Sequence, residues 1–360
     1  MKRIYFFAWI LTAVLLSCAS KKRLFTAHYD EYLVGCEYFA GWQEKGTKAN
    51  YPGYPERIPL NGEYITPEVM TKDIDVAASH GVDFFAILWY PNKYAQNPIV
   101  EDVNKAVDWF AASPSAHKMK FMLEITNHHP FLVKTIEEWA EVAAMCAEKM
   151  KHPSYLKIDG RPVLKIHGGG AFIADLNHDV EEANRILARI REVITAAGIE
   201  EPIIAIGLTQ AVRVTDAQRL KLLDIDLSMQ YADFPNLPYS DTDYPYSDLL
   251  SASKKARLAR VDDSVPFVPF IAVGWNPRPL KSKSPSFAFP TREEWKASLE
   301  DMKADLDAYP RLGFPRKDGT YQKAFTIYAW NEYGEGGILS PSQGDGTMKL
   351  EVIQEIFGNR

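Results

Sequence analysis

The sequence predicts a single (β/α)8, or TIM, barrel, because strand-like and helix-like segments alternate eight times along its 360 residues. The composition shows no break between these segments, so one large α/β domain is favoured over two smaller ones. An open, doubly wound sheet is the alternative fold. Such sheets usually carry a glycine-rich phosphate turn after the first strand, and Gly35-Cys36-Glu37-Tyr38 offers none.

The predicted strands are short apolar runs that alternate with longer segments of helical spacing. Thr66-Pro67-Glu68 supplies a cap, a first-turn proline and an early acid for one helix, and Gly81 and Gly198 follow two helix ends. In chain order the strands cover residues 33–39, 82–89, 120–125, 162–166, 202–206, 225–230, 266–273 and 323–329. The helices cover residues 67–80, 99–112, 133–150, 180–197, 215–223, 246–261, 292–309 and 346–357.

Two glutamates follow the last predicted strand and are the strongest candidates for catalysis. The run from Phe325 to Trp330 is apolar, and the change to Asn, Glu and Gly after it marks the point where the strand leaves the core. Glu332 and Glu335 lie here among glycines, which allow sharp turns and a close approach to a ligand. Catalytic groups of a (β/α)8 barrel come from the carboxyl ends of its strands, so these glutamates are the predicted catalytic pair.

Aromatic, amide, histidine and carboxyl side chains also follow the other predicted strands. Flat rings stack on the C–H faces of sugars and polar groups bind sugar hydroxyls, so this combination is typical of a carbohydrate site. The predicted substrate-binding residues, including those beside the two glutamates, are Tyr38, Trp89, Tyr90, Glu124, Asn127, His128, His167, Tyr231, Trp275, Asn276, Arg278, Trp330, Asn331 and Tyr333.

The first residues predict export and a lipid anchor. Lys2 and Arg3 form a basic start, residues 4–16 are mostly apolar but too few to span a bilayer comfortably, and Ser17-Cys18-Ala19 closes the run. This pattern resembles a bacterial lipoprotein signal, which implies cleavage before Cys18 and lipid attachment to that cysteine. A plain secretory signal or short anchor is the alternative. We expect a signal peptide at residues 1–17, a lipid-anchored tether at residues 18–31 and a catalytic domain at residues 32–360.

Charge and cysteine content narrow the expected partners. Loss of the signal segment with its two basic residues would move the formal charge from −6 to −8, and no stripe of Lys and Arg indicates a nucleic-acid surface. Cys36 and Cys146 lie in apolar segments and are expected as buried free thiols rather than a disulfide. His128-His129 lacks a third histidine at helical spacing, so we expect no structural metal. We expect a monomer. Its expected partners are a glycan substrate and, through the lipid anchor, a membrane.

Three segments carry a family resemblance: Ala329-Trp330-Asn331-Glu332-Tyr333-Gly334-Glu335-Gly336, the unit from Tyr64 to Trp89, and Val273-Gly274-Trp275-Asn276-Pro277-Arg278-Pro279. They resemble glycoside hydrolase family 99 and its relatives, some of which are labelled polysaccharide-biosynthesis glycosyltransferases. The resemblance spans about Leu33 to the C-terminus. It implies a (β/α)8 barrel and retaining, endo-acting cleavage of α-mannosides without a cofactor. It also implies that Glu332 deprotonates the sugar 2-hydroxyl, giving a 1,2-anhydro intermediate, and that Glu335 is the general acid/base.

The sequence departs from the family pattern at two places. Characterised mannosidases usually have Trp-His between the glutamates, where this chain has Tyr333-Gly334. Their third strand tends to end in His-Ile-Glu-Pro-Tyr, and the corresponding stretch here is Glu124-Ile125-Thr126-Asn127-His128, with the acid displaced. These changes bear on mannose specificity more than on hydrolysis.

The residues themselves indicate how a glutamate pair would cleave a glycoside. One carboxyl protonates the leaving oxygen and the other acts as base or nucleophile, and without the resemblance both retention and inversion stay open. The protonated acid needs a raised pKa near neutral pH. We expect that rise from the like charge of its partner and from desolvation by Trp330, Tyr333, Trp275 and Trp89.

Three function classes compete, and a glycoside hydrolase ranks first. A non-catalytic glycan-binding lipoprotein ranks second, since it would keep the aromatic residues without needing the acids. A glycosyltransferase would need a donor site. Asp224-Ile225-Asp226 has metal-holding spacing, but we expect it at the start of a strand, far from the mouth of the barrel. The sequence therefore predicts an exported, lipid-anchored hydrolase of α-linked oligo- or polysaccharides, with mannose-containing glycans as the expected class.

Overall fold

A computed structural model describes residues 31–43, 48–94, 103–209, 221–232 and 234–358. The predicted signal peptide, Cys18 and nearly all of the predicted tether lie outside these residues. Within the described part of the chain, no helix is long and apolar enough to cross a membrane.

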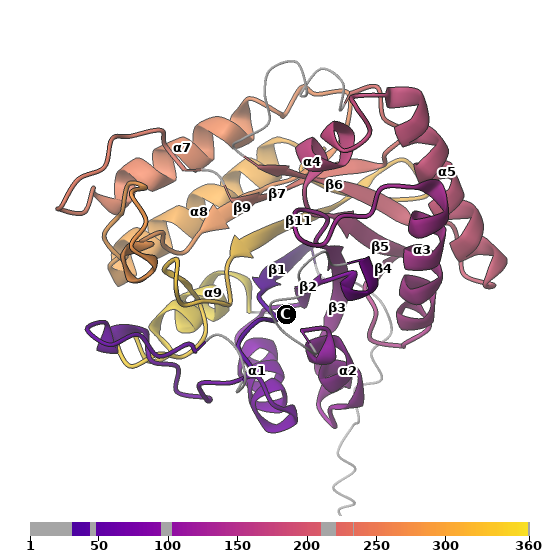
Figure 1. Cartoon of the computed structure of the whole chain (residues 1–360). Helices are drawn as coiled ribbons and strands as arrows, with labels where there is room; N and C mark the ends of the chain where they lie inside the picture. Colours follow the sequence, from indigo (N-terminus) through magenta and orange to yellow (C-terminus); the bar gives the residue numbers. More distant parts are fainter. Residues whose placement is uncertain (1–30, 44–47, 95–102, 210–220, 233, 359–360) are drawn as a thin grey trace, which may run out of the picture.

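The predicted (β/α)8 barrel is confirmed. Its staves run parallel in the order of the chain, and the last one, β11, pairs with β1 and with β9 to close the sheet (Figure 1). The staves are β1 (Tyr32–Tyr38), β2 (Phe84–Trp89), β3 (Lys120–Ile125), β5 (Arg161–Ile166), β6 (Ile203–Thr209), β7 (Leu227–Ala232), β8 (Phe267–Val268) with β9 (Phe270–Ala272), and β11 (Tyr321–Tyr328).

The seventh predicted strand is divided in two because Pro269 interrupts it. Proline has no N–H to donate to a ladder, so pairing passes from β7–β8 before this residue to β9–β11 after it. The short pieces β4 (Lys157–Ile158), β10 (Gly313–Pro315), β12 (Asn331–Glu332) and β13 (Gly337–Ile338) were not predicted, because two or three residues carry no periodic signal.

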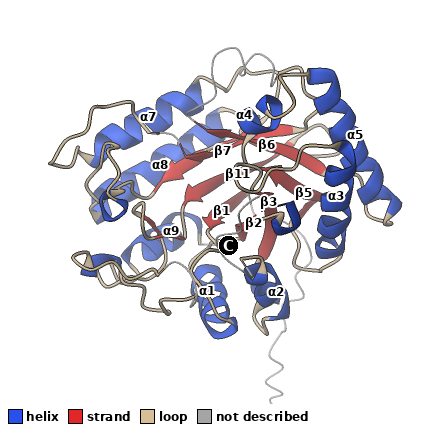
Figure 2. Cartoon of the chain, viewed as in Figure 1, coloured by secondary structure: helices blue, strands red, loops and turns tan. Residues whose placement is uncertain are grey.

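Helices surround the sheet (Figure 2). Thr66 caps the first of them as expected, since its side chain accepts a hydrogen bond from the backbone N–H of Val69. The helices are α1 (Pro67–Ser79), α2 (Lys105–Ala112), α3 (Ile136–Met150), the unpredicted short α4 (Gly169–Ala174), α5 (Val180–Ala196), α7 (Tyr246–Leu258), α8 (Arg292–Ala308) and α9 (Met348–Phe357). The predicted helix at 215–223 lies mostly outside the described residues, and residues 221–223 form a turn and a bend.

The core has two parts, as alternation along each strand requires. One cluster inside the barrel takes residues from every stave, for example Leu33, Phe84 and Met122, whereas the other cluster joins the outer faces of the staves to the helices. Cys36 and Cys146 are both buried and free, which confirms that prediction.

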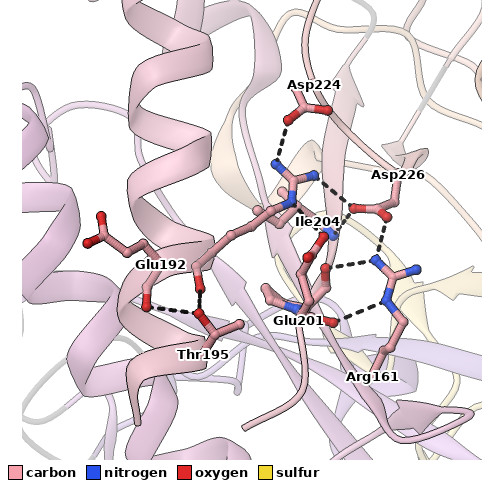
Figure 3. Close-up of polar contacts among 9 residues, drawn as sticks. Arg161, Glu192, Thr195, Glu201, Ile204, Asp224 and Asp226 are labelled. Carbon is pink, nitrogen blue, oxygen red and sulfur yellow. Dashed lines mark hydrogen bonds and ion pairs between the residues drawn. The ribbon is translucent and has the colours of Figure 1, made fainter. Parts of the chain in front are cut away.

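An ion-pair network holds the amino ends of three staves together (Figure 3). Asp226, just before β7, receives Arg161 at 2.6 Å, Arg191 at 3.0 Å and the backbone N–H of Ile204 at 2.9 Å. Arg191 also reaches Asp224 at 3.2 Å. The Asp224-Ile225-Asp226 segment therefore lies at the amino end of the barrel, as expected, and both of its carboxylates are bound by arginine.

Candidate active site

A cavity of about 430 Å³ opens at the carboxyl ends of the staves, where the barrel fold places its chemistry. Both predicted catalytic glutamates line it. Four predicted substrate-binding residues, Tyr90, His128, His167 and Tyr231, line it as well. The remaining wall is formed by Phe39, Gly41, Leu88, Val103, Thr126, His129, Pro130 and Phe131.

A tight hairpin positions the two glutamates. Asn331–Glu332 (β12) pairs antiparallel with Gly337–Ile338 (β13), and the N–H groups of Glu335 and Gly336 donate to the carbonyl of Glu332 at 3.0 and 2.9 Å. Gly336 has φ +85°, and a Cβ there would lie 2.7 Å from the backbone nitrogen of Asn276. Only glycine satisfies both constraints, so the sharp turn predicted from the glycines is present.

Two neighbouring elements fix this hairpin to the barrel. Arg57 is 1% exposed and donates to the carbonyl of Tyr333 at 3.0 Å and to the side chain of Asn276 at 3.0 Å. The N–H of Asn276 donates to the carbonyl of Glu335 at 2.5 Å. Both ends of the turn are therefore bound by groups from outside it, which restricts the movement of the two carboxyl groups.

Glu332 has one hydrogen-bond donor, the hydroxyl of Tyr231, at 2.9 Å from Oε1. Burial in the cavity wall, followed by the like charge of Glu335, raises the pKa of Glu332 to about 8, and the Tyr231 hydroxyl opposes that rise. A carboxyl group in this state holds its proton at neutral pH, when most carboxyl groups have lost theirs.

Glu335 accepts a hydrogen bond from the hydroxyl of Tyr328, at the end of β11. Burial also raises the pKa of Glu335, whereas Tyr328 and the nearby His167 favour its ionised form. Both cavity glutamates therefore have raised pKa values, and the doubly ionised pair is disfavoured. A pair that retains one proton near neutral pH can supply an acid and a base together.

His167 lines the cavity with Glu332 and Glu335 and also contacts a charged group deeper in the barrel, Glu124. Its Nδ1 lies 2.6 Å from Oε1 of Glu124, which is fully buried and 2.8 Å from the ammonium of Lys165. The ring of His167 packs edge-on against Tyr231, with centroids 4.6 Å apart. The residues around both cavity glutamates are thus supported from inside the barrel.

Seven predicted substrate-binding residues lie behind the cavity and do not line it. Several of them position residues that do. Asn331 exchanges two hydrogen bonds with the backbone of Phe39 at 2.8 and 2.9 Å, and Asn127 does the same with Gly168, next to His167. For Tyr38 and Trp89 strand alternation explains the difference, since successive side chains face opposite sides and these two pack in the outer cluster. The seven are Tyr38, Trp89, Glu124, Asn127, Trp330, Asn331 and Tyr333.

The aromatic wall of the cavity also differs from the prediction. Trp330, Tyr333, Trp275 and Trp89 were expected to desolvate the glutamates, but none of them lines the cavity. Trp330 is fully buried against Phe85, the hydroxyl of Tyr333 is bound to Ser340, and Trp275 stacks on Phe234 with ring centroids 3.7 Å apart. The Phe and Tyr rings that line the cavity are those of Phe39, Tyr90, Phe131 and Tyr231.

Asn276 and Arg278 lie beside the cavity and are bound to protein groups. The guanidinium of Arg278 binds Asp243 at 2.8 Å and the carbonyl of Ser240 at 3.0 Å. Asn276 donates to the same Asp243 at 3.1 Å. Arg278 is therefore a partly exposed arginine held by a nearby acid.

The sequence analysis did not predict several residues of the cavity wall, most of which lie in the loops that follow the strands. Phe39, His129 and Phe131 had a usable signal, because each lies within a few residues of a predicted strand end or of His128. Val103 had none, because it precedes a helix in a stretch without strand-like periodicity. Within the described residues, no cluster of three or more His, Cys, Asp or Glu side chains is arranged to hold a metal ion.

Comparison with known proteins identifies a matching family and several solved structures of similar fold. A model of the family described as "Glycosyltransferase WbsX" matches residues 37–353. No curated protein matches the chain. A "Glycoside hydrolase-like protein" is similar in structure, with TM-score 0.65 and 15% identity over 91% of this chain and 94% of that one.

Two further solved structures are similar to this chain, with lower TM-scores than that protein. The GH99 endo-alpha-mannosidase from Bacteroides thetaiotaomicron has TM-score 0.56 and 13% identity, covering 89% of this chain and 95% of that chain. A GH5-4 broad specificity endoglucanase from an uncultured bacterium has TM-score 0.51 and 11% identity, covering 90% and 93%. At these identities the likeness establishes the shared barrel fold alone.

Proposed function

The chain belongs to the family described as "Glycosyltransferase WbsX", and from that premise and the geometry of the cavity we propose that it hydrolyses glycosidic bonds. The observation that carries the proposal is the pair Glu332 and Glu335, two cavity carboxyl groups with raised pKa values and no cationic side chain bound to either in the described structure. Glycoside hydrolysis needs an acid and a base at the scissile bond.

The proposed reaction gives each glutamate one role. Glu335 in its protonated form donates to the leaving oxygen as the C1–O bond breaks, and Glu332 in its ionised form accepts the proton of the sugar 2-hydroxyl. The 2-oxygen then bonds to C1 and gives a 1,2-anhydro sugar. Water that loses a proton to Glu335 attacks C1, the C1–O2 bond breaks, and O2 takes back its proton from Glu332, with net retention. The disfavoured double ionisation supports a pair that keeps one proton for the first step. The raised pKa of Glu332 places that proton on Glu332 in the free protein, so the proposed roles require it to pass to Glu335 when substrate binds, and the division of roles itself rests on the family resemblance.

The proposed substrate is an α-linked glycan, with mannose-containing glycans as the first class to test. Rings of Phe39, Tyr90, Phe131 and Tyr231 offer stacking surfaces beside the glutamates. The specificity of this site should differ from that of mannosidases with a side chain at position 334. A Cβ on Gly334 would lie 2.8 Å from the hydroxyl of Tyr51, so Tyr51 fills that space here.

A glycosyltransferase is the second candidate, because the family description names one. A donor site of the metal-holding type would need free carboxylates near the cavity. Asp224 and Asp226 are bound by arginine at the opposite end of the barrel, which weighs against that role. A glycan-binding protein without activity is the third candidate, and it would leave the two glutamates without a function.

One assay separates these candidates. Defined α- and β-linked oligosaccharides are incubated with the protein, with and without nucleotide sugars, and the products are identified by mass spectrometry. Hydrolysis predicts shorter glycans in water alone. Longer glycans that form only with a nucleotide sugar would indicate transfer, and retention on immobilised glycan without any product would indicate binding.

A substrate analogue tests the role of Glu332. Once a substrate is known, its 2-deoxy form should bind with similar affinity and fail to turn over, because Glu332 has no hydroxyl to deprotonate. Rapid hydrolysis of the 2-deoxy analogue, or an inverted product by NMR, would exclude the 1,2-anhydro route. An ordinary two-carboxylate glycosidase would then remain.

We also propose that the protein acts outside the cytoplasm, tethered to a bacterial membrane by lipid on Cys18. The support is the sequence pattern of residues 1–19, which lie outside the described structure. The Cys18→Ala variant should move from the membrane to the soluble fraction, since no described helix can span a bilayer. Persistent membrane association of this variant would contradict the anchor.

A further inference from the structure

Three charged side chains meet inside the barrel, below the cavity. Glu37 of β1, Glu124 of β3 and Lys165 of β5 each have no exposed surface. The ammonium of Lys165 lies 3.0 Å from Oε1 of Glu37 and 2.8 Å from Oε1 of Glu124. Two carboxyl groups therefore share one cation, and the fully ionised trio would leave one uncompensated negative charge in the interior.

The hydrogen bonds of the trio show where a proton is missing. Oε1 of each glutamate is bound, but Oε2 of Glu37 and Oε2 of Glu124 are buried without a partner if both groups are ionised. Both carboxyl groups lie within 3.0 Å of the same ammonium nitrogen, which brings them close to each other. One proton between them would supply the missing donor and acceptor and would neutralise the trio.

We propose that Glu37 is a neutral acid that donates this proton to Glu124, and that the trio thereby fixes His167 with its proton on Nδ1 and its Nε2 available to the cavity. Glu37, Lys165 and Glu124 are positioning residues in this account, since only His167 lines the cavity. The value of this arrangement for catalysis rests on the proposed glycosidase function, whereas the position of the two protons does not.

The environments of the two acids support this placement of the proton. Burial and the charge of Glu124 raise the pKa of Glu37, and Lys165 only partly opposes them. For Glu124, burial acts in the same direction but is outweighed by Lys165 and by hydrogen bonds from Glu37 and His167, so its pKa is lowered. Burial lowers the pKa of Lys165, but the two glutamates outweigh it, so the net shift is upward and the cation is retained.

The ionised Glu124 then determines the tautomer of His167. Its Oε1 is an acceptor only, and it lies 2.6 Å from Nδ1, so Nδ1 must carry the proton in this contact. A carboxylate that orients a histidine in this way also holds the ring in place. The unprotonated Nε2 is left to accept a hydrogen bond from a group in the cavity that His167 lines.

A matched pair of substitutions tests the proposal, because both glutamates are equally buried and touch the same lysine. In Glu37→Gln the amide imitates a neutral acid, since it donates to Glu124 and accepts from Lys165. In Glu124→Gln the anion is lost. We expect His167 to keep its Nδ1 proton in the first variant and to become a mixture of tautomers in the second.

The readout is the long-range 1H–15N NMR spectrum of histidine-labelled protein, with the His167 signal assigned by its loss in His167→Gln. Turnover, where a substrate is known, should be at least about 10-fold lower in Glu124→Gln than in Glu37→Gln. A wild-type His167 protonated on Nε2, or a Glu37→Gln variant that shifts the tautomer as strongly as Glu124→Gln does, would overturn the proposal.

The test stays decisive if one variant does not fold or if the protein shows no hydrolytic activity. If Glu124→Gln does not fold, the wild-type tautomer and the Glu37→Gln spectrum still decide the outcome. If the protein hydrolyses no glycan, the NMR result stands without any activity, so failure of the proposed function is distinguished from failure of this inference.

Discussion

Carboxyl groups at the two ends of the barrel have opposite surroundings. At the amino end, Asp226 receives two arginines and a backbone N–H within 3.0 Å. At the carboxyl end, Glu332 receives one tyrosine hydroxyl at 2.9 Å and lies close enough to Glu335 for their charges to interact. Asp226 is thus paired with cationic and polar donors, whereas burial and the like charge of Glu335 keep the proton on Glu332.

This difference separates structural acids from reactive ones. The carboxylate of Asp226 stabilises the fold, because its ion pairs and its hydrogen bond link α5 to three staves. An acid buried beside a like charge makes the folded state less stable above its pKa, and a protein retains such a group where a reaction uses it. The comparison predicts which substitutions reduce activity and which reduce stability.

The largest effect is expected from Glu332→Gln and Glu335→Gln. Each should lower turnover of a verified glycan by at least about 100-fold, because positioned acid and base groups contribute that much. Rates measured with the same enzyme concentration, on protein whose circular dichroism matches wild type, would check this. Rates within a few-fold of wild type would remove these residues from the mechanism.

The stability of Glu332→Gln provides a control with a defined sign. The pKa of Glu332 is higher in the folded protein than the ordinary 4.5, so the stability gained from its proton is lost as pH rises from about 4.5 through about 8. Glutamine cannot ionise. At pH 8 the variant should therefore be at least as resistant to heat as wild type, although it is inactive.

The next effect is expected from Asp226→Asn, at the other end of the barrel. Loss of the charge removes strong hydrogen bonds to Arg161 and Arg191, which should lower the free energy of unfolding by about 2 kcal/mol. Turnover of the folded protein should change less than about threefold. Urea unfolding and the glycan assay measure the two quantities, and a large loss of turnover without loss of stability would reverse the comparison.

The smallest effect is expected from Arg278→Met. The arginine is bound to Asp243 beside the cavity, and such partly exposed ion pairs contribute about 0–1 kcal/mol. We expect kcat to be unchanged and KM to rise less than about threefold. A fall in kcat comparable to that of Glu335→Gln would place Arg278 in the reaction itself.

Much of the architecture could be predicted because it repeats. Apolar runs and helical spacing alternate eight times, and the change of composition after Trp330 marks the strand end that carries Glu332 and Glu335. Tyr90, His128, His167 and Tyr231 were found by the same reasoning, since each lies in the last residues of a strand or just after it and lines the cavity.

The rest depends on side-chain direction and on contacts between distant strands. Tyr38 and Trp330 lie at strand ends but face the core, and their sequence positions do not reveal this. Glu37 and Lys165 had a signal, because each interrupts an apolar strand with a charge. Their pairing across the barrel nevertheless needed the three-dimensional structure.

The central claim is that an acid without a cationic partner holds its proton at the mouth of the barrel, and titration of Glu332 tests it most directly. Protein labelled with 13C at glutamate carboxyl groups is titrated by NMR, and the Glu332 signal is assigned by its loss in Glu332→Gln. We predict a midpoint near 8, which moves down in Glu335→Gln because the like charge is gone. A midpoint near the ordinary 4.5, unchanged in Glu335→Gln, would contradict the account.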